Sequence, residues 1–333
     1  NNQNLLAVPL SIFMGLILEK TKIAENLISN MNMLFKEASS GLAISVVVVG
    51  ALMAASTGIV GASVVTLGLL TYPVLVKNGY SASIASGTIC ASGTLGQIIP
   101  PSLVLILLAD VLSSSYQQAQ LNVGIFSPET ITIGDLFMGA LIPGLILPLL
   151  YIIYLRTLNI KNSHTSTRTK LDLYSIIFPL SLMIIVLGSI ILGIATPSEA
   201  AGLGALGAIV LSYSQKNLTK KTLDKCIYES IKLTSMVFMI LIGATLFSLV
   251  FRGLEGEEFI HRFLVEMPND KFMTLIIILL IMFLLGFILD FIEITFIVIP
   301  LVGPALFTLG FDPLWIGILI ALVLQTSFIT PPF

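Results

Sequence analysis

The sequence predicts an all-α, multi-pass membrane protein built from two related halves, and three observations carry this prediction. Only 10% of its 333 residues are charged, whereas soluble domains average roughly 25%. Two apolar regions are too long, or too interrupted, to be single membrane-spanning helices. A Pro-Pro pair also recurs in both halves of the chain.

The composition excludes several classes of protein. A hydrophobic fraction of 56% and a mean hydropathy of +1.04 leave too few charges to cover the surface of a soluble or secreted protein. The net charge of −2 argues against nucleic-acid binding. The H-E-x-x-H, G-x-S-x-G and P-loop motifs do not occur, so we expect no enzyme activity and no cofactor.

Because the chain starts at Asn1, we also expect that further sequence precedes it.

Five apolar stretches predict ordinary membrane spans, since about 20 apolar residues cross the hydrocarbon core. They are Leu5–Leu18, Leu136–Leu155, Leu173–Pro197, Ala200–Ser214 and Leu233–Phe251. We expect polar loops at Arg156–Asp172 and Lys216–Lys232.

Two further regions predict re-entrant hairpins. Ala38–Val76 contains 39 residues without a charge, and its centre, Ala54–Ser63, is rich in Gly, Ser and Thr. This run is too long for one span and leaves almost no turn for two. In the second region, Phe272–Leu309, Asp290 and Glu293 interrupt the apolar run. Such backbone is tolerated in a membrane where protein or a water-filled cavity covers it.

Each hairpin is followed by an apolar stretch that a Pro-Pro pair should break. The first stretch is Ser81–Ala109, interrupted from Ser92 to Ser102 and containing Pro100 and Pro101; the second is Pro313–Phe333, with Pro331 and Pro332. The two regions align without a gap at an offset of 231, which also pairs Pro73 with Pro304 and Gly79 with Gly310. The alignment predicts an internal repeat.

The basic residues predict that the two halves have opposite orientations. If both polar loops and Lys20, Lys22, Lys36 and Lys77 are cytoplasmic, thirteen basic residues lie inside. Only Arg252, Arg262 and Lys271 then lie outside. The hairpins would enter the membrane from opposite faces, which is the inverted repeat typical of secondary transporters.

Small polar residues at the first hairpin and its broken helix are candidate cation ligands. Hydroxyl groups and the carbonyls of unwound backbone coordinate sodium in membrane proteins. The candidates of the first hairpin are Ser56, Thr57, Gly58, Gly61 and Ser63, and those of the broken segment are Ser92, Gly93, Thr94 and Gly96. The alternative is close helix packing, for which small residues are also typical.

Charged groups in the second half are candidates for substrate binding or coupling. Asp290 and Glu293 share one helical face, and carboxylates in membrane segments are functional-site candidates. Solvation in an aqueous vestibule is the alternative for both. The candidate partners of these acids are Gln325, Thr326, Ser327 and Thr330. Arg252 could attract an anionic solute or could simply extend its side chain to the interface.

These motifs resemble the large permease subunit of TRAP (tripartite ATP-independent periplasmic) transporters, the DctM-like proteins. The resemblance rests chiefly on Ser92-Gly-Thr-Leu-Gly-Gln-Ile-Ile-Pro-Pro-Ser102 and Leu324-Gln-Thr-Ser-Phe-Ile-Thr-Pro-Pro-Phe333, and it extends over nearly all of the chain. It implies a multi-pass protein of the bacterial inner membrane that imports organic acids with sodium. Its partners would be a Q-type small permease subunit and a periplasmic solute-binding protein.

The resemblance also implies an elevator-type transporter in which hairpins and broken helices move against a scaffold. Sodium would sit where each hairpin tip meets its broken helix. The resemblance implies a first site at Ser56, Gly58, Ser63, Ser92, Gly93 and Thr94 and a second site at Thr326, Ser327 and Thr330. The expected organisation is a scaffold helix and amphipathic segment (1–37), a first transport half (38–110), scaffold helices with loops (111–232) and a second repeat (233–333). The second repeat contains the hairpin at 272–309 and the broken helix at 313–333.

Three other functions stay open at this point. A proton-coupled carrier could use Asp290 and Glu293. An intramembrane enzyme would have the same two acids as its catalytic groups. A structural membrane subunit would have no pathway for a solute.

Overall fold

The computed structural model describes residues 3–21, 23–35, 40–57, 60–160, 172, 174–256, 259–260, 262 and 271–330. Across these residues the regular structure is entirely helical, as predicted, and contains no strand. The chain divides into two compact units. Unit 1 comprises Asn1–Leu103 and Ala140–Lys232, and unit 2 comprises Val104–Gly139 and Leu233–Phe333.

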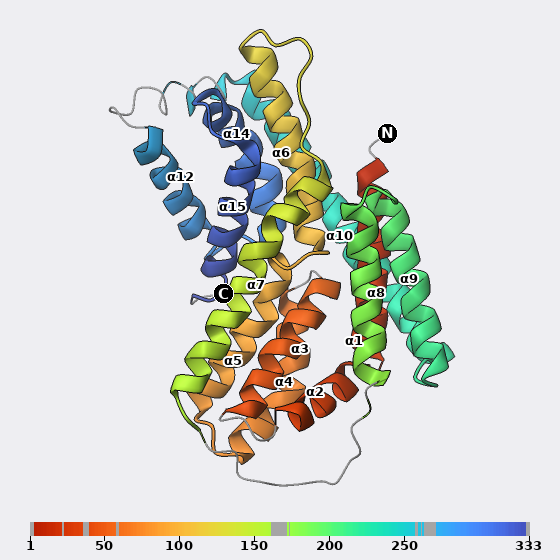
Figure 1. The fold of residues 1–333 in the computed structure, drawn as a ribbon. Coiled ribbons are helices and arrows are strands. Elements are labelled where there is room, and N and C mark those ends of the chain that lie inside the picture. Colours follow the sequence, from red (N-terminus) through yellow and green to blue (C-terminus); the bar gives the residue numbers. More distant parts are fainter. Residues whose placement is uncertain are drawn as a thin grey trace. The chain divides into compact units, whose positions relative to one another are not determined.

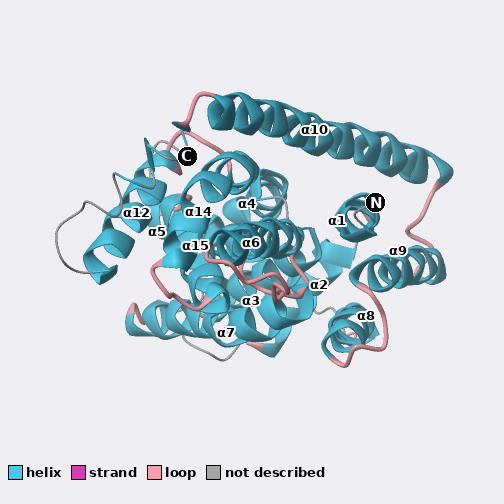
Figure 2. Cartoon of the chain, turned by 90° about the horizontal axis from the view of Figure 1, so that it is seen from above, coloured by secondary structure: helices cyan, strands magenta, loops and turns pink. Residues whose placement is uncertain are grey.

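Unit 1 consists of a helical frame and a hairpin. Its elements are η1 (Gln3–Leu6), α1 (Ala7–Lys20), α2 (Ile23–Leu34), α3 (Gly41–Thr57), α4 (Val60–Lys77), α5 (Ala82–Thr94), η2 (Leu95–Gln97), the second part of α7 (Ile133–Thr157), α8 (Tyr174–Ile191), α9 (Pro197–Ser214) and the first part of α10 (Lys220–Gly253). Helix α9 packs against both α1 and α8 (Figures 1 and 2). Helices α3 and α4, here called the first hairpin, pack against each other and against α5 (Figure 1).

The connection between α4 and α5 shows how the local sequence sets the path of the chain. Gly79 has a φ of +88°, a conformation that glycine adopts without the steric cost of a Cβ. The Tyr80 N–H donates to the Leu75 carbonyl at 3.2 Å and closes the end of α4. The Ser81 hydroxyl then accepts from the Ile84 N–H at 3.3 Å and caps α5. One helix thus ends and the next begins within four residues.

The interruption after α5 is shorter than the sequence analysis predicts. Ser92, Gly93 and Thr94 are helical, the 3₁₀ turn η2 follows, and α6 (Leu103–Asn122) begins after the cis-linked pair Pro100–Pro101. The prediction of unwound backbone from Ser92 onward is wrong. Proline disturbs the residue before it and clashes with the carbonyl four positions earlier, so its effect does not extend to Ser92–Thr94.

Unit 2 contains the second hairpin. Its elements are α6 from Val104, the first part of α7, the second part of α10, α12 (Lys271–Leu285), α13 (Phe291–Glu293), the π-helical segment η3 (Ile294–Val298), α14 (Ile299–Thr308) and α15 (Pro313–Ser327). Helix α12, the turn Gly286–Asp290 and the stretch Phe291–Thr308 form the second hairpin. Helix α12 packs against α15.

Glycines let the helices of unit 2 approach closely. A Cβ on Gly303 of α14 would lie 3.0 Å from the Cβ of Ser115 on α6. A Cβ on Gly317 of α15 would lie 2.6 Å from Leu112 Cδ1, also on α6. Both α14 and α15 therefore pack against α6.

Elements of the two units begin and end at matching separations. Helix α4 covers Val60–Lys77 and the returning arm of the second hairpin covers Phe291–Thr308, so both ends are 231 positions apart. Helices α5 and α15 begin at Ala82 and Pro313, which is the same separation. Gly310, 231 positions after Gly79, also has a positive φ, of +81°.

Helix α10 begins much earlier than the sequence analysis predicts. The predicted loop Lys216–Lys232 is helical from Lys220 onward, and Figure 2 shows α10 as one long helix. The Thr219 hydroxyl accepts from the Thr222 N–H at 3.1 Å, as an N-cap does. Lysine and glutamate are also good helix formers. The charges in this segment signal polarity, not loop structure.

Three helical stretches of the described chain are long and apolar enough to cross a membrane: α7, α10 and Phe291–Thr308. Large apolar side chains are exposed on them, for example Ile142 on α7 and Leu249 on α10, each 67% exposed. Such exposed apolar surface suits contact with lipid.

Candidate functional site

In unit 1, the end of α5 contacts both arms of the first hairpin. A Cβ on Gly50 of α3 would lie 2.5 Å from the Cβ of Ser92. A Cβ on Gly93 would lie 3.0 Å from the Cα of Val64 on α4. Close packing, the alternative to ion binding, therefore accounts for the small residue at both glycines. The same packing places the candidate ligands Ser92 and Gly93 against the hairpin.

The hydroxyl groups at the end of α5 donate to their own helix. Ser92 Oγ donates to the Thr88 carbonyl, and Thr94 Oγ1 donates to the Ala91 carbonyl at 3.1 Å. Ser92 is fully buried and Thr94 is 2% exposed. A hydroxyl that donates its proton keeps lone pairs with which it can contact a cation. The geometry is therefore compatible with oxygen ligands at both positions.

The remaining candidates of the first site lie at the hairpin turn. Ser63 is buried near the start of α4. Ser56 lies in the last turn of α3, and Gly58 lies outside the described residues.

In unit 2, the turn of the second hairpin contacts the end of α15. A Cβ on Gly286 would lie 2.8 Å from the Cβ of Ser327 and would clash with its Oγ. Ser327 is fully buried, and its Oγ donates to the Leu324 carbonyl at 2.8 Å. The hairpin turn and a candidate ligand of the second site thus lie together.

The other candidates near the second hairpin have different surroundings. Gln325 is fully buried, whereas Thr326 is exposed and donates to the Val323 carbonyl at 2.8 Å. Thr330 follows the end of α15, and its hydroxyl donates to the Ser327 carbonyl. Pro331 and Pro332 lie outside the described residues.

Asp290 and Glu293 form a capping box at the start of α13. Asp290 Oδ1 accepts from the Phe291 N–H at 2.7 Å, and Glu293 Oε2 accepts from the Asp290 N–H at 3.3 Å. The two acids therefore satisfy backbone donors that would otherwise lack partners at the helix start. This capping role is local, and a role of the two acids in coupling stays a prediction.

Arg252 lies exposed in the last turn of α10. Its Nη2 donates to Gln118 Oε1 on α6 at 3.5 Å, within unit 2. The side chain thus connects two helices of the unit.

Two buried side chains are missed by the sequence analysis. Gln97 in η2 is 1% exposed, and its Oε1 makes no hydrogen bond to the described residues. Thr295 is fully buried in the π-helical segment η3, and its hydroxyl makes none either. Segments of π-helix are frequent at functional sites. Two features of the sequence could have indicated them. Gln97 stands three residues before a Pro-Pro pair, and Thr295 is a hydroxyl residue within an apolar run.

Comparison with known protein families identifies the chain. The family model described as "Tripartite ATP-independent periplasmic transporter, DctM component" matches residues 1–333. The chain belongs to this DctM family. The resemblance found in the sequence motifs is thereby confirmed.

Curated relatives of this DctM-family chain are named as transporter permeases. The C4-dicarboxylate TRAP transporter large permease protein DctM of Pseudomonas aeruginosa is 28% identical over 335 residues, which cover 98% of this chain and 74% of the relative. The isethionate TRAP transporter permease protein DctMQ of Oleidesulfovibrio alaskensis is 26% identical, with 98% of this chain and 50% of the relative covered.

A solved structure shares the fold of the DctM-family chain. The Alcanivorax borkumensis YdaH transporter matches with a TM-score of 0.69, covering 99% of this chain and 74% of that one. The sequence identity is 15%, so this similarity concerns the fold alone.

Proposed function

We propose that this DctM-family chain forms the solute pathway of a sodium-coupled transporter that imports a small organic anion across the bacterial inner membrane. The contact between a hairpin and a helix ending in buried hydroxyl groups carries the proposal. It occurs in unit 1 between Gly50 and Ser92, and in unit 2 between Gly286 and Ser327. Oxygen-rich helix ends of this kind bind sodium in secondary transporters.

The names of the relatives support an anionic solute. C4-dicarboxylates carry two carboxylates and isethionate carries a sulfonate, and the relatives are named for these two solutes. The class of solute shared by both is a small organic acid in its ionised form.

The matching separations of elements support an inverted repeat that moves in an elevator-type mechanism. Helix α4 and the stretch Phe291–Thr308 begin and end 231 positions apart, as expected for a duplicated hairpin. The predicted division of basic residues, thirteen inside and three outside, agrees with opposite orientations of the two halves. In this proposal the hairpins with α5 and α15 move, while α1 and α7–α10 form the scaffold.

The family description supports two partners. The description calls the transporter tripartite and periplasmic. A DctMQ relative of which this chain covers 50% has room for a fused small permease subunit. We therefore propose that a small permease subunit and a periplasmic binding protein complete the transporter.

Uptake into vesicles tests the coupling ion. The full-length chain and its small permease subunit would be reconstituted, and the binding protein loaded with its solute would be added outside. We expect uptake only with an inward sodium gradient. Uptake that ignores sodium and follows a proton gradient would overturn sodium coupling, and chemical conversion of the solute would favour an enzyme.

Substitutions of two threonines test the ion sites. Thr94→Ala and Thr326→Ala should each raise the sodium concentration for half-maximal uptake, because each removes one oxygen ligand. Thr94→Ser keeps the hydroxyl and should retain the sodium dependence of the unsubstituted protein. An unchanged sodium dependence in both alanine variants would count against both sites.

A further inference from the structure

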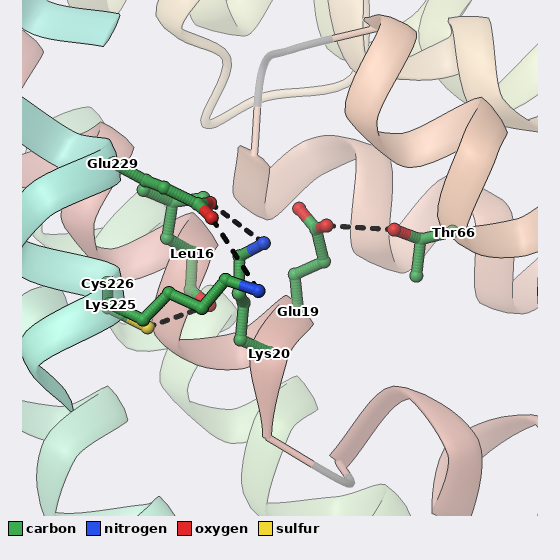
Figure 3. A network of polar contacts seen from close by, with 7 residues as sticks. All are labelled: Leu16, Glu19, Lys20, Thr66, Lys225, Cys226 and Glu229. Atoms are coloured by element: carbon green, nitrogen blue, oxygen red, sulfur yellow. Dashed lines mark hydrogen bonds and ion pairs between the residues drawn. The ribbon is translucent and has the colours of Figure 1, made fainter. Parts of the chain in front are cut away.

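A hydrogen bond joins α1 to the first hairpin within unit 1. Thr66 Oγ1 on α4 donates to Glu19 Oε1 in the last turn of α1 at 2.8 Å. Figure 3 shows the Glu19 carboxylate turned toward Thr66, while the neighbouring Lys20 extends to Glu229 of α10. The adjacent residues Glu19 and Lys20 therefore contact different helices, α4 and α10.

Helix α1 is fixed independently of this bond. Lys20 Nζ lies 2.7 Å from Glu229 Oε2. The Cys226 Sγ of α10 also donates to the Leu16 carbonyl at 3.6 Å (Figure 3), and Ser212 of α9 donates to Thr21, the residue after α1, at 3.4 Å. Since α9 and the first part of α10 both hold it, α1 belongs to a frame that the first hairpin contacts through the packing of α3 and through the Thr66 hydrogen bond.

Among the described residues, Thr66 supplies the hydrogen bond to the Glu19 carboxylate. Its second oxygen, Oε2, is buried and makes no hydrogen bond to the described residues. The adjacent ammonium of Lys20 is directed to Glu229. Loss of the Thr66 hydroxyl would therefore leave the carboxylate without a hydrogen-bond donor from the described residues, which is costly for a partly buried group.

We propose that Glu19 is a positioning residue that holds the first hairpin against α1 in the state described here, acting through Thr66. The inference rests on the proposed function, because it requires that the first hairpin moves between two positions. The hydrogen bond between Thr66 and Glu19 forms in one of these positions. The bond must break when α4 moves along α1. The positions 231 residues later hold Val250 and Ile297, whose side chains cannot form a hydrogen bond, so this hold acts on the first hairpin alone.

Distances between spin labels in the full complex test the hold. One label would be placed on Cys90, exposed on α5, and the other on a cysteine from Tyr213→Cys, since Tyr213 is 75% exposed on α9. Two distances are expected, one for each end of the movement. A hydrogen bond to a charged group is strong enough to change their ratio about tenfold.

Matched variants separate the hydrogen bond from general packing. Thr66→Val should shift the ratio away from the state described here, and Glu19→Leu should do the same. The double variant should shift it no further, since both changes remove one contact. Thr66→Ser keeps the hydroxyl and should restore the original ratio. Thr71→Val is the control, because Thr71 Oγ1 donates only to Leu67 in its own helix, at 2.7 Å.

Two results would overturn the inference, and they differ in what else they affect. An unchanged ratio in Thr66→Val, with two distances present, would overturn the hold and leave the proposed transporter intact. A single distance in all variants, at every sodium and solute concentration, would overturn the hairpin movement and the hold together.

Discussion

Gly286 and Ser327 lie in direct contact at the turn of the second hairpin. A Cβ on Gly286 would come within 2.8 Å of the Ser327 Cβ, closer than real side chains pack. Glycine at position 286 is therefore required by the approach of the hairpin turn to α15. The contact joins the turn of the second hairpin to a residue that is proposed to bind sodium.

Gly286→Ala should separate the hairpin turn from α15. We expect a loss of roughly 1–3 kcal/mol in unfolding free energy, typical of overpacking, and a higher sodium concentration for half-maximal uptake. Adding Ser327→Gly removes the atoms that the new methyl would meet, so the double variant should recover part of the stability. Thermal unfolding of the complex and sodium titrations of uptake measure both effects. An unaltered melting temperature in Gly286→Ala would contradict the tight contact.

Two glycines on α5 form a matched pair for the first hairpin. Gly93→Ala should destabilise the protein, because the new Cβ would lie 3.0 Å from the Val64 Cα. A backbone atom cannot relieve such a clash by a change of rotamer. Gly87 is exposed on the same helix and has no atom within 4 Å of such a Cβ. Gly87→Ala should therefore be neutral or stabilising by about 0.5–1 kcal/mol, the helix preference for alanine. Equal melting temperatures for the two variants would show that α5 is not tightly packed against α4 at Gly93.

The sequence predicts the positions of helices better than their ends. Runs of apolar residues locate α1 and α7, because lipid and core select for the same composition. The predicted loop at Lys216–Lys232 is wrong from Lys220 onward, because charge alone does not distinguish a polar helix from a loop. The ion pair of Glu229 with Lys20 is a contact of that helix that depends on the folded chain. Charge patterns do not reveal that the partner of Glu229 is Lys20, 209 positions earlier in the chain.

The candidate site is predicted as a set of segments, not as a set of contacts. Ser92 and Ser327 are candidates because they are small polar residues in apolar segments. In the structure each of them contacts a hairpin. The capping box of Asp290 and Glu293 follows the known spacing of acidic caps, yet inside an apolar run the same spacing also suits a functional pair. Thr295 could not be singled out, because its buried hydroxyl is exceptional only once its surroundings are known.

The start of α9 should show a pH-dependent stability. The Thr196 N–H and hydroxyl each donate to Glu199 Oε2 at 2.8 Å, and these bonds lower the pKa of Glu199. A lowered pKa means that the folded state favours the ionised carboxylate. Its contribution is therefore present above the ordinary pKa, about 4.3, and is lost as the pH falls through the lowered value.

Thr196→Ala tests this capping box. It should lower the melting temperature at pH 6, and the difference from the unsubstituted protein should shrink as the pH falls below about 4. Glu199→Gln, which cannot ionise, should show a smaller pH dependence across the same range. A difference that stays constant from pH 6 to pH 3 would argue that the Glu199 charge contributes nothing.

Asp290 offers the decisive comparison between a helix cap and a proton carrier. Asparagine is as good an N-cap as aspartate but cannot bind and release a proton at this position. If the capping contact to Phe291 is the role of Asp290, Asp290→Asn should retain uptake within about twofold, and Asp290→Ala should lose about 1 kcal/mol of stability. Uptake into vesicles and thermal unfolding of the complex measure these effects. Abolished uptake in Asp290→Asn, with an unchanged melting temperature, would instead favour the proton-coupled carrier.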